Sequence, residues 1–139
     1  MILADTNVLS ALMQAQPDSA VIRWLDLQPH ASIWTTSITV LEIRFGIEIL
    51  TSGRRRSALS ATFDRLLTEV IESRIAPFDA RAAEEAARLM AARKARGQPG
   101  ELRDTMIAGI ALATRAAIAT RNVRHFEDVS CPIIDPWSA

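Results

Sequence analysis

Three acidic residues, Asp5, Glu42 and Asp104, have the spacing and surroundings of residues that could share a site. Asp5 ends a short apolar run, Glu42 lies beside an apolar stripe at helical spacing, and Asp104 lies in the first turn of another apolar helix. Carboxylates brought together repel one another, so one of them tends to stay protonated. A hard divalent cation such as Mg²⁺ or Mn²⁺ removes this conflict and activates a bound water toward a phosphodiester. The three acids therefore indicate metal-assisted phosphodiester hydrolysis.

Each acid also has a purely structural interpretation. Asp5 is suited to cap or turn the chain before the next helix, and Asp104 is suited to interact with the positive end of its own helix. Glu42 has Arg44 nearby in sequence, although residues two apart on a helix point to different sides. The residue types alone leave the structural and the chemical interpretations open.

Composition excludes several classes of protein. A chain of 139 residues, 49% of them apolar, predicts a single domain over 1–139 with a real core and excludes disorder. The formal net charge of zero means that binding to a polyanion needs a local patch or a metal. The single cysteine excludes an intrachain disulfide, and no zinc pattern, GxGxxG, P-loop or nucleophile elbow is present. No apolar run is long enough for a secretory or membrane segment, so we expect a cytoplasmic protein.

Strand and helix signals alternate along the chain. Short apolar or β-rich runs predict strands at 2–4, 33–36, 75–78, 117–120 and 132–135. Helical patterns with caps and breaks predict helices at 8–13, 38–50, 58–73, 80–96 and 101–115, with one more after Asp18 or Ser19. This alternation predicts an α/β fold with a parallel sheet, whose strand ends would bring the acids to one edge.

Two helices offer a predicted core face. Helical spacing assigns the inward positions as Ile38, Leu41, Phe45 and Ile49 in the third helix and Ala83, Ala87 and Met90 in the fifth.

The basic run Arg54-Arg55-Arg56 lies near a helix start, where cations oppose the macrodipole. We interpret it as a solvated surface, with contact to a phosphate backbone or an acidic partner as the alternative.

Four segments resemble the PIN-domain ribonucleases, especially the FitB-like branch of the VapC toxins from bacterial toxin–antitoxin systems. They are MILADTNVLSAL, SITVLEIRFGIEIL, RDTMIAGIAL and AIATRNVRHFEDV, and the ending Asp135-Pro136-Trp137 is similar too. The resemblance covers essentially the whole chain. It implies a PIN-like three-layer fold, with a twisted parallel five-stranded sheet flanked by helices, and RNA cleavage with Mg²⁺ or Mn²⁺.

The resemblance also implies roles for individual residues. Asp5 and Asp104 match metal ligands, and Glu42 matches an acid that binds the metal or orients water. Thr6 and Thr120 match small hydroxyl residues that support the site. In many relatives a fourth acid stands at the position of Asn122, and in others it stands near the position of His125. Neither position is acidic in this chain, and this departure puts a second metal in doubt.

The partners implied by the resemblance are an RNA substrate, a second copy of the chain and a cognate antitoxin, with operator DNA bound only through the antitoxin. One rival interpretation is a PIN-like module that no longer cleaves RNA and serves mainly as an antitoxin partner. Another is a different metal-dependent phosphohydrolase with Asp5 as a covalent nucleophile, but such folds usually need an acid two residues later, and position seven is Asn.

Overall fold

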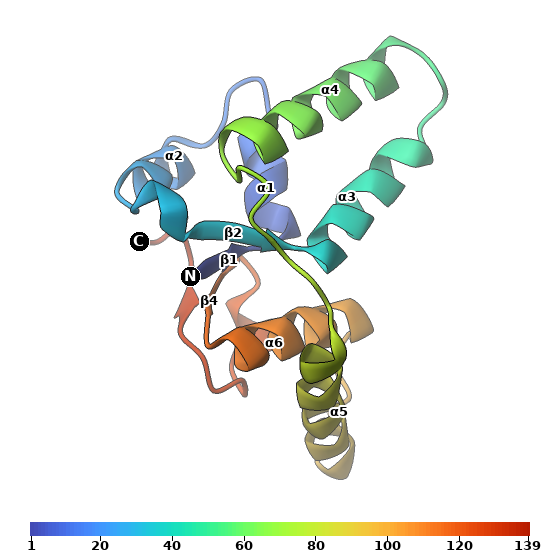
Figure 1. Ribbon diagram of the computed structural model, residues 1–139, viewed down its shortest axis with the longest axis vertical. Helices are drawn as coiled ribbons and strands as arrows, with labels where there is room; N and C mark the ends of the chain where they lie inside the picture. The colour runs from blue at the N-terminus through green and yellow to red at the C-terminus, as the bar shows by residue number, and fades with distance from the viewer.

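The computed structural model describes residues 1–139 as an α/β fold in which helices cover both faces of a five-stranded sheet (Figure 1). The strands are β1 (Ile2–Ala4), β2 (Ile33–Thr36), β3 (Ile75–Ala76), β4 (Ala117–Ala119) and β5 (Ile133–Ile134). The α-helices are α1 (Thr6–Leu12), α2 (Ser19–Asp26), α3 (Ser37–Glu48), α4 (Arg54–Glu69), α5 (Ala80–Ala95) and α6 (Leu102–Thr114). Two 3₁₀ helices, η1 (His30–Ser32) and η2 (Val123–Phe126), complete the chain. None of the helices combines the length and apolar character needed to span a membrane.

The sheet is parallel throughout, in the order β3-β2-β1-β4-β5, which confirms the predicted fold class. The chain extends the sheet from β1 toward β3 and then returns to add β4 on the other side of β1. The strand order therefore reverses between β1 and β4, and the carboxyl ends of these strands are the place where open α/β sheets bind ligands. Asp5 and Thr120 follow these two strands directly.

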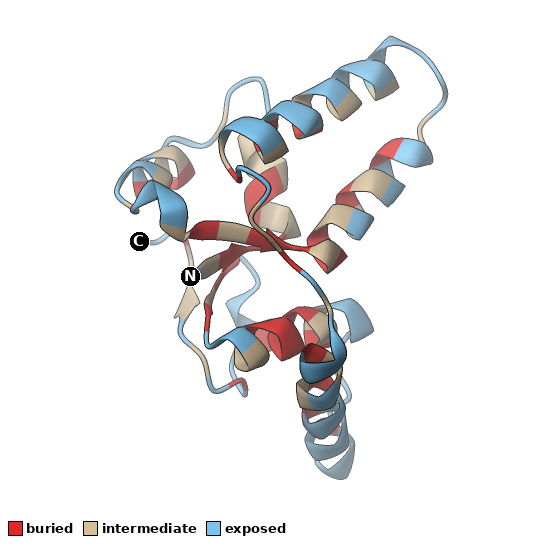
Figure 2. Cartoon of the chain, in the orientation of Figure 1, coloured by how far each residue is buried: buried red, intermediate tan, exposed pale blue.

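The core has two halves, one on each face of the sheet. One half packs α5 and α6 against the sheet and contains Leu3, Ile107, Ile110 and Ile118 among its buried residues. The other half lies beneath α1, α2, α3 and α4, as Figure 2 shows by the buried surfaces that these helices turn inward. Helices on both faces explain why the central strands are almost entirely apolar.

Gly109 sets the close packing of α5 against α6. A Cβ built at Gly109 would lie 2.5 Å from the backbone oxygen of Ala82 and 2.9 Å from the Cβ of Ala86. Only glycine fits at this distance, because any side chain would push the two helices apart. The face that α5 turns inward is therefore fixed by the residues that meet Gly109.

Two predicted core faces are wrong, apart from Ile38, which is buried as predicted. In α3 the buried residues are Ile38, Thr39, Ile43 and Ile47, whereas Leu41, Phe45 and Ile49 are 55%, 57% and 66% exposed. In α5 the buried residues are Ala82, Ala86, Leu89 and Arg93, whereas Ala87 and Met90 are exposed. Each helix carries apolar or small residues on two adjacent faces, so periodicity alone did not show which face meets the sheet.

Several element boundaries also differ from the prediction. Helix α4 begins at Arg54, so the three arginines form its first turn, and it ends at Glu69. Glu72 and Ser73, in the turn that follows, have φ angles of 49° and 59°, which a helix does not allow. Helix α1 begins at Thr6, two residues before the predicted start, and Asp5 is its N-cap.

Candidate active site

Asp5 links the end of β1 to the start of α1. Its backbone N–H donates to the carbonyl of Ala119 in β4, 3.0 Å away, and its Oδ1 accepts from the N–H of Val8 at 3.2 Å. The capping interpretation of Asp5 is therefore correct. However, the side chain is also buried at the switch point of the sheet, so capping alone does not account for its position.

Burial dominates the electrostatics of Asp5. Desolvation raises the pKa of its carboxyl from 3.8 to about 6, and the negative charge of Asp104 adds to this rise. The Thr120 hydroxyl and the backbone N–H groups of Val8 and Asn7 act in the opposite direction by stabilising the charged form. A buried acid that must ionise beside another acid is typical of a functional site.

Glu42 projects from the half-buried side of α3 toward α1. Its Oε1 accepts a hydrogen bond from the Thr6 hydroxyl at 3.0 Å, and its Oε2 lies 3.9 Å from the guanidinium of Arg103. Burial raises the pKa of Glu42, and the charge of Asp104 raises it further. The proposed pairing with Arg44 does not occur, because Arg44 forms its ion pair with Asp64 and lies over the ring of Phe63.

Asp104 lies in the first turn of α6, where its backbone N–H donates to Oε2 of Glu101, the N-cap residue, at 2.9 Å. Its own Oδ2 lies 2.7 Å from Nδ1 of His125 in η2. Because Asp104 raises the pKa of both Asp5 and Glu42, it is the acid that connects the other two. The three predicted acids therefore share one electrostatic environment at the carboxyl edge of the sheet.

The side chains do not form a closed metal site. No three histidine, cysteine or carboxylate side chains are gathered closely enough to hold one ion between them. Glu42 is hydrogen-bonded to Thr6, and Asp104 is in contact with His125. The chemistry of the donors nevertheless fits a hard cation, since Asp5, Glu42 and Asp104 offer only oxygen atoms and the first two have raised pKa values that a cation would lower.

The predicted supporting residues differ in their positions. Thr6 donates to Glu42, and the buried Thr120 acts on Asp5 and accepts a hydrogen bond from the backbone N–H of Asn122 at 2.9 Å. The Asn122 side chain lines a neighbouring hollow and forms no hydrogen bond with any of the acids. Its predicted role at the metal stays a prediction.

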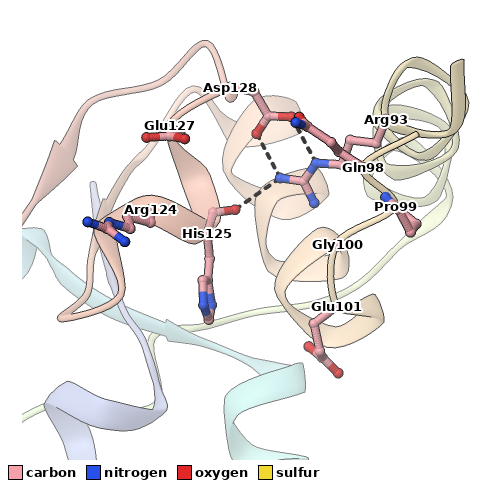
Figure 3. Close-up of a pocket in the computed structure, with 9 residues that line it drawn as sticks. All are labelled: Arg93, Gln98, Pro99, Gly100, Glu101, Arg124, His125, Glu127 and Asp128. Atoms are coloured by element: carbon pink, nitrogen blue, oxygen red, sulfur yellow. Dashed lines mark hydrogen bonds and ion pairs between the residues drawn. The ribbon is translucent and has the colours of Figure 1, made fainter. Parts of the chain in front are cut away.

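Sequence reasoning missed the residues that hold Asp104 and η2 in place. Arg93, which is 4% exposed, donates to both carboxylate oxygens of Asp128 at 2.9 and 2.8 Å and to the backbone carbonyl of His125 at 3.0 Å (Figure 3). A further hydrogen bond of 2.8 Å joins Arg93 to the Thr105 hydroxyl in α6. The hydrogen bonds from Arg93 to Asp128 hold the pKa of Asp128 well below its usual value, at about 2. An arginine at a helical core position was the only signal available.

A pocket of about 330 Å³ lies beside this network. The nine residues that line it are Arg93, Gln98, Pro99, Gly100, Glu101, Arg124, His125, Glu127 and Asp128. Figure 3 shows the His125 ring and the Glu101 carboxylate pointing away from the Arg93 guanidinium. The network therefore forms one wall of the pocket and supports the segments that carry these two side chains.

Comparison with known proteins shows the family of the chain. A model of the PIN domain family matches residues 2–130. "VapC ribonuclease Y4jK" from Sinorhizobium fredii is 37% identical over 99% of this chain and 98% of its own length, and "Toxin FitB" from Neisseria gonorrhoeae is 31% identical over 99% of both. A solved structure of FitAB bound to an IR36 DNA fragment superposes with a TM-score of 0.88, at 31% identity over 99% of this chain and 96% of the other. The chain therefore belongs to the PIN domain family and, within it, to the VapC-type toxins related to FitB.

Proposed function

We propose that this protein is a metal-dependent endoribonuclease and the toxin of a toxin–antitoxin pair. The observation that carries the proposal is the burial of Asp5 at the switch point of the sheet, within the electrostatic reach of Asp104. The name of the S. fredii relative, a VapC ribonuclease, supports RNA as the substrate. Asp5 and Asp104 would hold Mg²⁺ or Mn²⁺, with Glu42 as a third oxygen donor or as the group that orients water.

When bound, the ion would supply positive charge to the phosphodiester and lower the pKa of a coordinated water. The residues of this chain contribute orientation and charge. Thr6 fixes one oxygen of Glu42, and the other oxygen stays on the side of Arg103. Arg103, whose side chain is 47% exposed, is available to contact the phosphate backbone. His125 holds the Asp104 carboxylate in place.

The test of this proposal is cleavage of single-stranded RNA by the purified protein with Mg²⁺ or Mn²⁺ and with chelator.

A second candidate function is a weakly active or inactive PIN-like module that serves mainly as an antitoxin partner. It is favoured by Asn122 at the position of an expected acid and by the open arrangement of the carboxylates. Absence of metal-dependent cleavage, combined with tight binding of the antitoxin, would support this alternative.

The proposed assembly includes a second copy of the chain and a cognate antitoxin. An exposed apolar stripe on α3, formed by Leu41, Phe45 and Ile49, supports a protein–protein contact at this face. Phe63 and Leu66 of α4 are buried in the core and are not available for such a contact. Operator DNA would be bound through the antitoxin, in keeping with the DNA-bound FitAB complex.

A further inference from the structure

A polar hollow of about 550 Å³ lies next to the acids and has no role in the mechanism above. Its walls come from α1, from the loop between α1 and α2, from the segment after β4 and from the C-terminal residues. The side chains that matter here are Asn7, Gln14, Gln16, Arg121, Asn122 and Trp137. We call this feature the amide hollow, since four of these six residues carry a neutral side-chain amide.

The amides of the hollow have hydrogen-bonding capacity to spare. The side chains of Asn7, Gln16 and Asn122 form no hydrogen bond within the protein, and Gln14 uses only its nitrogen, which donates to the carbonyl of Ser10 at 3.2 Å. Asp18, the one acid in the wall, is engaged as the N-cap of α2. The hollow therefore offers several uncharged donors and acceptors in a small space.

A flat surface borders these amides. The guanidinium of Arg121 lies 4.9 Å from the centre of a Trp137 ring and has no carboxylate partner. Trp137 is fixed by its backbone N–H, which donates to Asp135 at 2.9 Å, and by the buried Pro136 before it. Stacked guanidinium and aromatic planes are surfaces on which nucleic acid bases stack.

Two chain segments connect the hollow directly to the acids. Asn7 follows Asp5 by two residues, and its backbone N–H acts on the Asp5 carboxylate. Asn122 follows Thr120 by two residues and donates its backbone N–H to the Thr120 hydroxyl. A strand of RNA with its scissile phosphate beside Asp5 therefore has the hollow within reach of a flanking nucleotide.

We propose that the amide hollow binds one base of the RNA, next to the scissile phosphate, and contributes to the choice of cleavage site. The proposal rests on the proposed ribonuclease function. Side-chain amides match the donor and acceptor edges of a base, and an aromatic–guanidinium surface matches its face. A site for backbone phosphate alone would need more cations than the single Arg121.

The direct test is an NMR titration of the wild-type protein with the four nucleoside monophosphates. The indole N–H of Trp137 and the side-chain amides of Asn7 and Gln14 report on the hollow. We expect at least one nucleotide to shift these resonances together and to lose this effect in Arg121→Gln. Arg81→Gln is the matched control, because Arg81 is an exposed arginine on α5. Unchanged resonances would overturn the proposal. That result is expected if the hollow instead binds a side chain of a partner protein.

A kinetic test uses an RNA with one mapped cut and an abasic nucleotide placed in turn at each flanking position. One abasic position should lower kcat/KM of the wild type by roughly ten-fold, the effect of losing one stacked base. Arg121→Gln and Trp137→Leu should lower kcat/KM on the intact RNA and lose sensitivity to that abasic position. Because Trp137 also packs against the core, Trp137→Leu must first be shown to unfold at a temperature near that of wild type.

The two proposals fail in different ways. Equal abasic penalties in wild type, Arg121→Gln and Trp137→Leu would overturn the base site while leaving the ribonuclease function intact. Nucleotide-induced shifts in a protein that cleaves no RNA would overturn the ribonuclease function, and with it the role of the hollow in choosing a cleavage site, while base binding in the hollow would be retained.

Discussion

His125 and Asp104 are in direct contact, with Nδ1 of the histidine 2.7 Å from Oδ2 of the acid. The contact joins η2, which follows β4, to the first turn of α6. Arg93 fixes η2 from the other side through the carbonyl of His125. The position of the Asp104 carboxylate therefore depends on contacts among three segments, which are α5, η2 and α6.

Asp5→Asn should stabilise the metal-free protein. The Asp5 pKa is raised from 3.8 to about 6. Ionisation of Asp5 therefore lowers the free energy of unfolding increasingly as pH rises from about 4 through 6. At pH 8 the amide should raise the free energy of unfolding by about 2–3 kcal/mol, because Asn still caps α1 and carries no charge. Urea unfolding with chelator at pH 8 and pH 4.5 measures this gain, which should largely disappear at the lower pH. Asp26→Asn is the control, because Asp26 is exposed; an equal gain in both variants would contradict the burial argument.

Arg93→Met should destabilise the fold. The substitution leaves Asp128, Thr105 and the carbonyl of His125 without their main donor. We expect a loss of about 2–3 kcal/mol in the free energy of unfolding, less than for a fully buried pair because Arg96 still contacts Asp128. Arg88→Met removes an exposed pair with Glu85 and should change stability by less than about 0.5 kcal/mol. Equal effects of the two substitutions in urea unfolding would show that the Arg93 network is not structural.

The ion pair between Arg93 and Asp128 predicts that the protein loses stability at acidic pH. The Asp128 pKa is lowered to about 2, so its stabilising effect is complete above about pH 4 and is lost as pH falls through about 2. Thermal unfolding between pH 4 and pH 2 should show this loss in wild type and a weaker one in Asp128→Asn. Identical slopes in the two proteins would contradict the assignment.

Gly109→Ala should weaken the packing of α5 on α6, because the new Cβ would lie 2.5 Å from the oxygen of Ala82. Gly46→Ala in α3 is a matched control, since no atom lies within 4 Å of the position of its Cβ. The control should gain about 0.5–1 kcal/mol from helix propensity, whereas Gly109→Ala should lose stability despite the same gain. Thermal unfolding of the two variants tests the close approach, and a stabilised Gly109→Ala would contradict it.

The exposed stripe of α3 should carry the contact with a second copy. Light scattering of the wild type, without antitoxin, should give a dimer, and Phe45→Ser should give a monomer. Met90→Ser, on the exposed face of α5, should leave the dimer intact. A monomeric wild type would refute the dimer, and disruption by Met90→Ser alone would assign it to α5.

The fold could be predicted from the sequence because each strand is a short apolar run between clear helix signals. The strand positions agree within two residues, and the second helix follows Asp18, its N-cap, as expected. The inward faces of α3 and α5 could not be predicted, because neighbouring faces are both apolar and only tertiary contacts such as that at Gly109 choose between them. Local periodicity does not contain that information.

The candidate site divides along the same line. Asp5, Glu42 and Asp104 could be singled out because each is an acid at the edge of an apolar pattern. His125, Arg103 and Arg93 act on these acids or their supports from positions distant in sequence, and no spacing rule connects them. The hydrogen bond from Thr6 to Glu42 was likewise visible only once α1 and α3 were placed side by side.

The rate of RNA cleavage with Mg²⁺, with Mn²⁺ and with chelator shows most directly whether this protein is a metal-dependent ribonuclease. Wild type is compared with Asp5→Asn, Glu42→Gln and Asp104→Asn. Glu84→Gln is the control, because Glu84 is an exposed acid on α5. We predict cleavage that requires the divalent ion and falls by at least about a hundred-fold in each of the three variants, as expected for groups that take part in the chemical step. Equal cleavage in the presence of chelator, or full activity of Asp104→Asn, would contradict metal-dependent cleavage at this site.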